Sequence, residues 1–137
     1  MVTNEVKQWL NTNDYINTII LGGIETHVCI QGTAIDLLHM GYNVSLGPNY
    51  LLFWNFFLKK YVFQQVHILV DATSSRSLLE RQIAIQNLQN VGTHITTTES
   101  VILNLIGDKN HVHFKTVQKL IKELNQLNKG LFIAAKI

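Results

Sequence analysis

Short apolar runs alternate along the chain with longer stretches in which apolar residues recur at helical spacing. The run Asn17–Gly22 is rich in β-branched residues and ends in glycine, so it predicts a short buried strand. Val66–Ala72 predicts a second strand, of the uninterrupted apolar kind that a parallel sheet buries on both faces. A third, shorter strand is expected at His94–Thr97, where β-branched residues gather.

Helical spacing follows each of the first two strands. Apolar residues between Thr26 and Met40 recur on one helical face, and Gly41 is placed to end that helix. A second helix begins after a cap at Ser75 or Ser77 and ends before Gly92. Its apolar stripe is expected to face the core and consists of Leu78, Leu79, Ile83, Ile85 and Leu88.

Three further segments have a helical pattern. Val6–Leu10 looks like the end of a helix, followed by a polar link at Asn11–Asp14. Val101–Ile106 is expected to form a short helix capped by Thr98 or Ser100. The last helix, His113–Leu127, needs a partner for its apolar face, which consists of Phe114, Val117, Leu120, Ile121, Leu124 and Leu127.

This order of elements predicts the fold class. Repeated strand and helix units imply right-handed crossovers and a parallel sheet with helices on both faces, that is, a three-layer αβα Rossmann-like α/β fold. A chain of 137 residues, 47% hydrophobic and 15% charged, suits one globular domain. Dinucleotide binding on such a sheet is disfavoured, because Gly22-Gly23 lacks the GxGxxG spacing.

Charge and cysteine content narrow the partners and the compartment. The net charge is +2 and the Lys and Arg residues are scattered, so we expect no nucleic-acid surface and favour a small-molecule or protein partner. The single cysteine cannot form an internal disulfide, which fits a reducing, cytoplasmic setting.

Met1–Trp9 is polar, so no secretory signal is expected there. The final Ala-Ala-Lys-Ile resembles a peroxisomal address, although a solvated tail is favoured.

The most apolar stretch, Ser45–Gln65, is not expected to cross a membrane. Its apolar part, Tyr50–Leu58, stops at Lys59-Lys60, far short of the roughly 20 residues that a membrane-spanning helix needs.

The stretch GIETHVC, residues 23 to 29, carries the candidate chemistry. Cys29 lies three residues after Thr26 and hence in the first turn of the predicted helix, where free backbone N–H groups and the helix dipole favour a thiolate. The same N–H groups could hold an oxyanion. The residues alone leave open whether Cys29 is a nucleophile or a buried structural cysteine.

Three stretches together give this chain a specific resemblance. GIETHVC, DATSSR and TTTES, with the segments around them, closely resemble the C-terminal half of isochorismatase-like cysteine hydrolases, above all the animal isochorismatase domain-containing proteins. The resemblance implies that Cys29 is the nucleophile and that a cis peptide bond joins Ile24 to Glu25. It further implies that the N–H groups of Glu25 and Cys29 form the oxyanion hole. The implied chemistry is hydrolysis, of amides in the nicotinamidase branch and of an enol ether in isochorismatase.

The resemblance also implies that parts of the active site are missing. An Asp that acts as base and a Lys belong to the N-terminal half of the family's domain, and Asp14, Asp36 and Asp71 do not match that Asp. Residues 1–137 therefore correspond to a C-terminal half with about three of six strands. We expect this chain alone to be inactive or nearly so, and an exposed sheet edge predicts a homo-oligomer. The alternative is a non-catalytic isoform or fragment that acts through protein association.

Residues 44–65 depart from the family pattern. Removing them joins GYN directly to VHILVDATSSR, as in the family. Val44-Ser45 can be encoded GTAAGT, a splice donor, and Gln65 can be encoded CAG, a splice acceptor. Our hypothesis is a retained intron or an error in the gene model; a surface insertion is the alternative, since long insertions in surface loops are tolerated.

The remaining candidates have weaker support. Glu25, Thr26 and His27 could line a substrate pocket, although Thr26 also suits a helix cap and His27 a solvent-facing position. His111 and His113 beside Asp108 lack a third metal ligand, so a surface loop is favoured and no metal or cofactor is expected. Structural ion pairing is the favoured interpretation of Asp71, Arg76 and Arg81.

Overall fold

The computed structural model of the chain describes residues 1–42 and 65–128. These residues fall into two compact units, which divide between Thr97 and Thr98 and are described separately. The predicted insert lies outside the described residues except for Gln65. No helix in the two described ranges is long and apolar enough to span a membrane.

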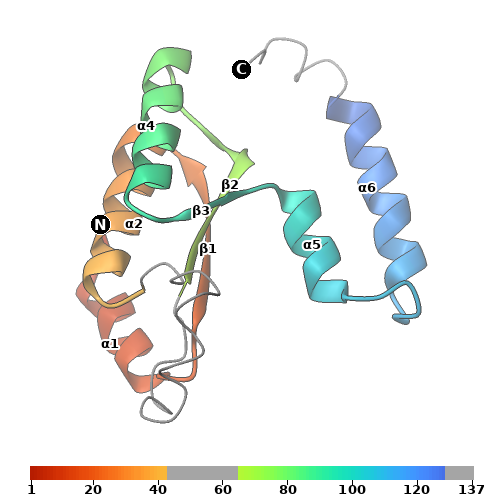
Figure 1. Ribbon diagram of the computed structural model, residues 1–137, viewed down its shortest axis with the longest axis horizontal. Helices are drawn as coiled ribbons and strands as arrows, with labels where there is room; N and C mark the ends of the chain where they lie inside the picture. Colours follow the sequence, from red (N-terminus) through yellow and green to blue (C-terminus); the bar gives the residue numbers. More distant parts are fainter. Residues whose placement is uncertain (43–64, 129–137) are drawn as a thin grey trace, which may run out of the picture. The chain divides into compact units, whose positions relative to one another are not determined.

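The first unit contains the predicted parallel sheet (Figure 1). Its described strands are β1 (Thr18–Ile24), β2 (Gln65–Ser74) and β3 (His94–Thr96), in the order β1-β2-β3. The predicted fold class, an α/β fold with a parallel sheet, is confirmed. Two boundaries differ from the prediction, because β1 continues through both glycines to Ile24 and β2 already begins at Gln65. The N–H of Gln65 donates to the carbonyl of Asn17 at 2.6 Å, which places Gln65 in the sheet.

Among the described residues of this unit, three α-helices accompany the sheet, and their ends follow from local chemistry. Helix α1 (Asn4–Thr12) begins after Thr3, whose hydroxyl accepts from the N–H of Val6, so the predicted helix end at Val6–Leu10 belongs to a complete helix. Helix α2 (Gln31–His39) is followed by Gly41, whose φ of 101° suits glycine. Helix α4 (Leu78–Asn90) has its predicted cap at Ser77, which accepts from the N–H of Glu80 at 3.4 Å.

One face of the sheet carries the core of the first unit. Buried residues of α1, α2, α4 and β2 form this core, together with Ile30 just before α2 and Tyr42 after it. Ile19, Leu21 and Ile95 of the sheet pack against it, and its buried members are Leu10, Ile30, Ala34, Leu37, Tyr42, Val66, Ile68 and Leu88. Right-handed crossovers that step in one direction across a sheet place their helices on the same face. The order of the described strands does not reverse, so the described helices of this unit pack on that one face.

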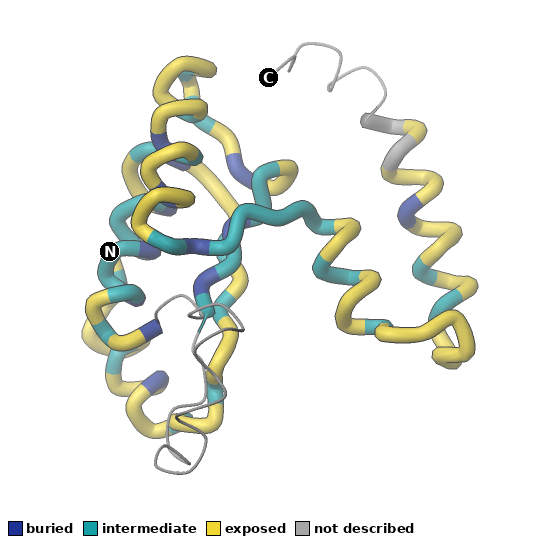
Figure 2. The backbone as a smooth tube through the Cα atoms, in the orientation of Figure 1, coloured by how far each residue is buried: buried dark blue, intermediate teal, exposed yellow. Residues whose placement is uncertain are grey.

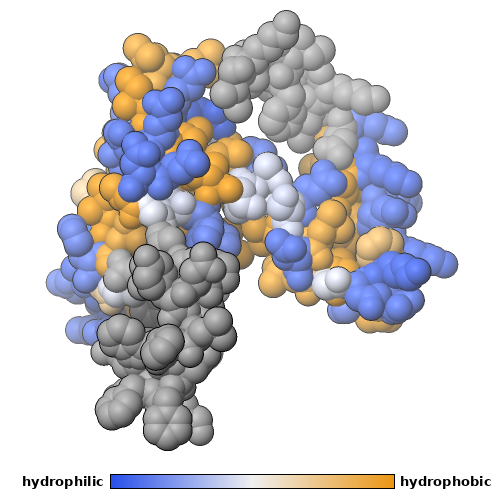
Figure 3. Space-filling view, in the orientation of Figure 1, coloured by the Kyte–Doolittle hydropathy of each residue, from blue (hydrophilic) through white to orange (hydrophobic). Residues whose placement is uncertain are grey.

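Helix α4 buries only part of the predicted apolar stripe, namely Leu88 and, partly, Ile85. Its buried residues are Ala84 and Leu88, one turn apart, whereas Leu78, Leu79 and Ile83 are exposed (Figure 2). Apolar side chains accordingly reach the surface in the region of α4 (Figure 3). The packed face of α4 is therefore narrow, since Ala84 and Leu88 are its buried residues.

The second unit consists of two helices joined by a loop. Helix α5 (Thr98–Ile106) begins three residues before the predicted start, so Thr98 and Ser100 lie inside the helix rather than at a cap. Helix α6 (Phe114–Asn128) matches the prediction within one residue at each end. Its predicted apolar face is only partly covered, because Ile121 is buried but Leu120 and Leu124 are about half exposed.

Candidate active site

The two sequence motifs GIETHVC and DATSSR meet at the carboxyl ends of β1 and β2. Ile24, the last residue of β1, pairs in the parallel register with Ser74, the last residue of β2. The hydroxyl of Thr26 donates to the carbonyl of Ser74 at 2.9 Å, and Thr26 is fully buried. The hydroxyl therefore joins the ends of β1 and β2. The alternative that Thr26 serves as a helix cap does not fit this contact.

A small polar cluster lies beside this contact. One carboxylate oxygen of Glu25 accepts from the backbone N–H of Arg76 at 3.0 Å and lies 3.5 Å from Nδ1 of His27. The same ring nitrogen is 3.0 Å from the hydroxyl oxygen of Ser75. The His27 side chain is only 17% exposed, so it is held against the loop after β2 and does not point freely into solvent.

Cys29 lies in a turn wider than an α-helix. Thr26–Ile30 forms a π-helical turn, labelled η1, and the α-helix proper starts only at Gln31. The carbonyl of Glu25 accepts from the N–H groups of Val28 and Ile30, at 3.2 and 3.1 Å. Cys29 stands between these two residues and is exposed. The prediction of a regular helix from Thr26 is thus corrected, and the exposure of Cys29 does not fit the alternative of a buried structural cysteine. Single π-helical turns frequently occur at functional sites.

The backbone before Cys29 has special geometry. The peptide bond between Ile24 and Glu25 is cis, and Gly23 has a φ of 131°, which favours glycine. The register between β1 and β2 shifts between Leu21 and Gly23. A Cβ atom on Gly22 would come within 3.2 Å of the carbonyl oxygen of Ala72. Gly22 therefore permits the close approach of β2, and Gly23 permits the positive φ, immediately before the turn.

The structure brings together all the site residues predicted from the sequence and adds others. Ile24, Glu25, Thr26, His27 and Cys29 form one continuous turn, and the contacts above add Ser74, Ser75 and Arg76 from the other motif. The contacts of Ser74 and Ser75 were missed because they join positions far apart in sequence. The rule that parallel strands end at one edge of the sheet could have identified them.

Three other predicted residues, Arg81, His111 and His113, have different contacts. Arg81 donates through its guanidinium to the carbonyls of Thr73 and Val70, so it holds the end of β2 through backbone oxygens. His111 and His113 are exposed in the loop before α6, where the N–H of His113 donates to Nδ1 of His111. Within residues 1–42 and 65–128, no group of three or more His, Cys, Asp or Glu side chains could hold a metal ion.

Known proteins share this arrangement of elements. The model of the isochorismatase domain matches residues 1–100. Isochorismatase domain-containing protein 1 of Danio rerio is 39% identical over 122 residues, which cover 89% of this chain and 35% of that protein. Isochorismatase domain-containing protein 2 of Xenopus laevis is 38% identical over 123 residues, or 90% of this chain and 49% of that protein.

Solved structures agree with the sequence matches. The MAR1 ribonuclease of Caenorhabditis elegans superposes with a TM-score of 0.65 at 34% identity, covering 88% of this chain and 50% of that one. An isochorismatase-like hydrolase of Alkaliphilus metalliredigens, 20% identical with a TM-score of 0.55, shares the fold over 77% of this chain and 44% of that one. The chain belongs to the isochorismatase-like hydrolase family. It spans half or less of the length of these relatives.

Proposed function

We propose that Cys29 is the nucleophile of a cysteine hydrolase that acts on a small-molecule substrate and needs a fuller form of the domain than this chain. The observation that carries the proposal is the exposed position of Cys29 in the η1 turn. That turn directly follows β1, at the carboxyl edge of the sheet, where ligands bind in open α/β folds. A structural cysteine would instead be expected among the buried residues.

The proposed reaction has two steps. The thiolate of Cys29 attacks the electrophilic carbon of an amide, the carbon–nitrogen bond breaks, and the leaving amine takes a proton. Water then attacks the resulting thioester, releasing the acid and regenerating the thiol. Negative charge that develops on the substrate oxygen would be held by the backbone N–H groups of Glu25 and Cys29. An enol ether would need proton delivery to its double bond as well.

Proton transfer is the part that this chain is proposed to lack. The family Asp and Lys have no matched residue in the sequence, and His27 is held by Glu25 and Ser75. A nucleophile without its base loses orders of magnitude in rate. The proposal therefore predicts that the isolated chain is inactive, although it still contains the turn that carries the nucleophile.

The test compares this chain alone with a fusion that carries the unmatched portion of the Danio rerio relative. Both are assayed against a panel of amides, esters and enol ethers, and each is also prepared as Cys29→Ser. The expected result is turnover by the fusion only, abolished by Cys29→Ser. Turnover that survives Cys29→Ser in the fusion would exclude Cys29 as the nucleophile.

A second candidate function is protein association without catalysis. The observation that favours it is the exposure of large apolar side chains on α4, where Leu78 and Leu79 are 65% and 64% exposed. A folded fusion that remains inactive on every substrate of the panel would favour this alternative.

A further inference from the structure

Three consecutive residues of the GIETHVC motif contact the loop after β2. Glu25, Thr26 and His27 each bind a different residue of the range 74–76. The contacts of Glu25 and Thr26 use backbone atoms of that loop, an N–H group and a carbonyl. The contact of His27 with Ser75 joins two side chains, so it can be removed from either end by substitution.

The ring of His27 is held in one orientation. Its Nδ1 atom lies 3.0 Å from the hydroxyl oxygen of Ser75 and 3.5 Å from a carboxylate oxygen of Glu25. A neighbouring carboxylate favours a hydrogen on the ring nitrogen that it faces, so we expect Nδ1 to donate to the hydroxyl of Ser75. The His27 side chain is largely buried, and water therefore competes little for this hydrogen bond.

The turn that follows differs from an α-helix in the hydrogen bonds that the carbonyl of Glu25 accepts. In an α-helix this carbonyl would accept from the N–H of Cys29. In η1 it accepts from the N–H groups of Val28 and Ile30, at 3.2 and 3.1 Å. Among the backbone hydrogen bonds of the described residues, it does not accept from Cys29, which lies between them. The wide turn therefore keeps this carbonyl off an N–H group that was proposed above to hold an oxyanion.

A π-helical turn needs support from its surroundings, because π-helical geometry is rare in proteins. His27 lies inside η1, two positions before Cys29. Helical residues two positions apart do not face each other, so His27 is not placed to act on the sulfur by direct contact. Any influence of His27 on Cys29 therefore passes through the backbone of the turn.

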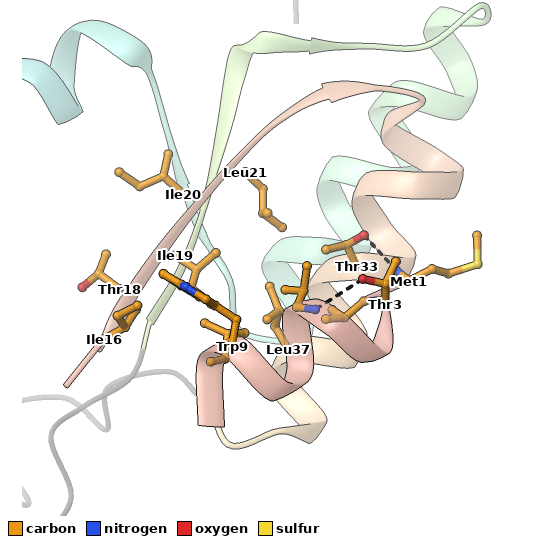
Figure 4. A pocket seen from close by; sticks show the side chains of 13 residues that line it. Met1, Thr3, Trp9, Ile16, Thr18, Ile19, Ile20, Leu21, Thr33 and Leu37 are labelled. Atoms are coloured by element: carbon orange, nitrogen blue, oxygen red, sulfur yellow. Dashed lines mark hydrogen bonds between the residues drawn. The ribbon is translucent and has the colours of Figure 1, made fainter. Parts of the chain in front are cut away.

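The apolar pocket of the first unit does not involve His27. This pocket has a volume of about 490 Å³, lies along β1 and is lined mainly by side chains of α1, β1 and α2 (Figure 4). Residues 23–29 do not contribute to its wall. The link to the loop after β2 is therefore the feature of His27 that calls for an explanation.

We propose that His27 is a positioning residue, which holds η1 in its wide form through Ser75 and thereby keeps the N–H of Cys29 available to the substrate. The catalytic meaning of this role rests on the proposed function of Cys29. Without the contact, the turn can tighten until the carbonyl of Glu25 accepts from the N–H of Cys29. Negative charge on the sulfur and on the substrate oxygen would then lose a stabilising backbone group.

The test measures the rate at which iodoacetamide labels Cys29 in the full native chain at neutral pH, beside the urea-unfolded chain. We expect His27→Ala to lower the native rate by about fivefold, the equivalent of one lost hydrogen bond. His27→Asn keeps a donor at the position of Nδ1 and should restore most of the rate. His39→Ala is the matched control, since His39 is an exposed histidine at the end of α2. Circular dichroism confirms that each variant is folded.

Ser75→Ala removes the same contact from the other end and serves even if His27→Ala fails to fold. The double variant is expected to label no more slowly than either single variant, because all three lack one shared contact. Fast wild-type labelling that neither single variant changes would overturn the positioning role and leave Cys29 as the nucleophile. Wild-type labelling no faster than that of the unfolded chain would overturn the proposed function, and the positioning role with it.

Discussion

The hydroxyl of Thr26 donates to the backbone carbonyl of Ser74 at 2.9 Å and joins the turn that carries Cys29 to the end of the neighbouring strand. Thr26 is completely buried, so no water replaces this contact within the folded unit. The geometry of the nucleophile turn therefore depends on a bond between residues 48 positions apart.

Thr26→Val keeps the shape of the side chain and removes its donor. Because the Ser74 carbonyl then loses a buried partner, we expect the free energy of unfolding to fall by about 1–3 kcal/mol. Thr12→Val is the matched control, since the Thr12 hydroxyl also donates to a carbonyl, that of Gln8, but at an exposed position. Urea denaturation compares the two, and equal losses would contradict the structural role of Thr26.

Glu25 ties the loop after β2 to the site through the N–H of Arg76. Glu25→Ala is expected to free this loop and to speed tryptic cleavage after Arg76 several-fold, whereas Glu25→Gln keeps an accepting oxygen and shows a smaller effect. The rate is followed by mass spectrometry under native conditions. Glu123→Ala, an exposed change on α6, serves as control, and an identical cleavage rate in all variants would show that the contact does not order the loop.

His67 makes stability depend on pH. Its ring stacks on that of His94, with 4.8 Å between ring centroids. Desolvation by burial, and then the nearby charge of His94, lower the pKa of His67 below its ordinary value of 6.5. The unfolded chain therefore binds the proton more readily than the folded chain. The contribution of neutral His67 to the free energy of unfolding is complete above pH 6.5, and it is lost as the pH falls below that value.

The measurement is the urea midpoint at pH 7.5 and pH 5.5. We expect the wild-type midpoint to fall at the lower pH, and His67→Gln to reduce that fall. His113→Gln removes an exposed histidine and should leave it unchanged. A pH dependence that His67→Gln does not alter would show that another group is responsible.

Residues 44–65 lead to a prediction about the transcript. If they are a retained intron, the major spliced message joins the codon of Asn43 to that of Val66. Long-read sequencing of the transcripts decides this. Abundant spliced messages that all keep the intervening codons would establish the segment as a translated insertion.

Much of the fold was predictable because its signals are local. The apolar runs of β1 and β2 identify strands without reference to the rest of the chain, and Ser77 and Gly41 mark helix ends by their own chemistry. The shared face of α1, α2 and α4 was not predictable, because it depends on strand order. The exposure of Leu78 and Leu79 likewise depends on which side of α4 meets the sheet.

In the candidate site, too, the local features were predictable and the contacts between distant residues were not. Cys29 and the four candidates just before it lie within one short motif, so sequence comparison identified them together. The π-helical turn has no apolar periodicity of its own and was predicted as ordinary helix. The contact of His27 with Ser75 crosses between two strand ends and became visible only in the folded chain.

The rate of iodoacetamide labelling of Cys29 at neutral pH tests the central claim most directly. This residue is the only cysteine, so the mass of the intact protein reports it alone. In the proposed mechanism, the backbone N–H groups of the η1 turn stabilise negative charge on the attacking sulfur. We therefore predict faster labelling in the native chain than in a urea-unfolded control and no labelling after Cys29→Ser. Native labelling that is equal to the control or slower would contradict the assignment of Cys29 as an activated nucleophile.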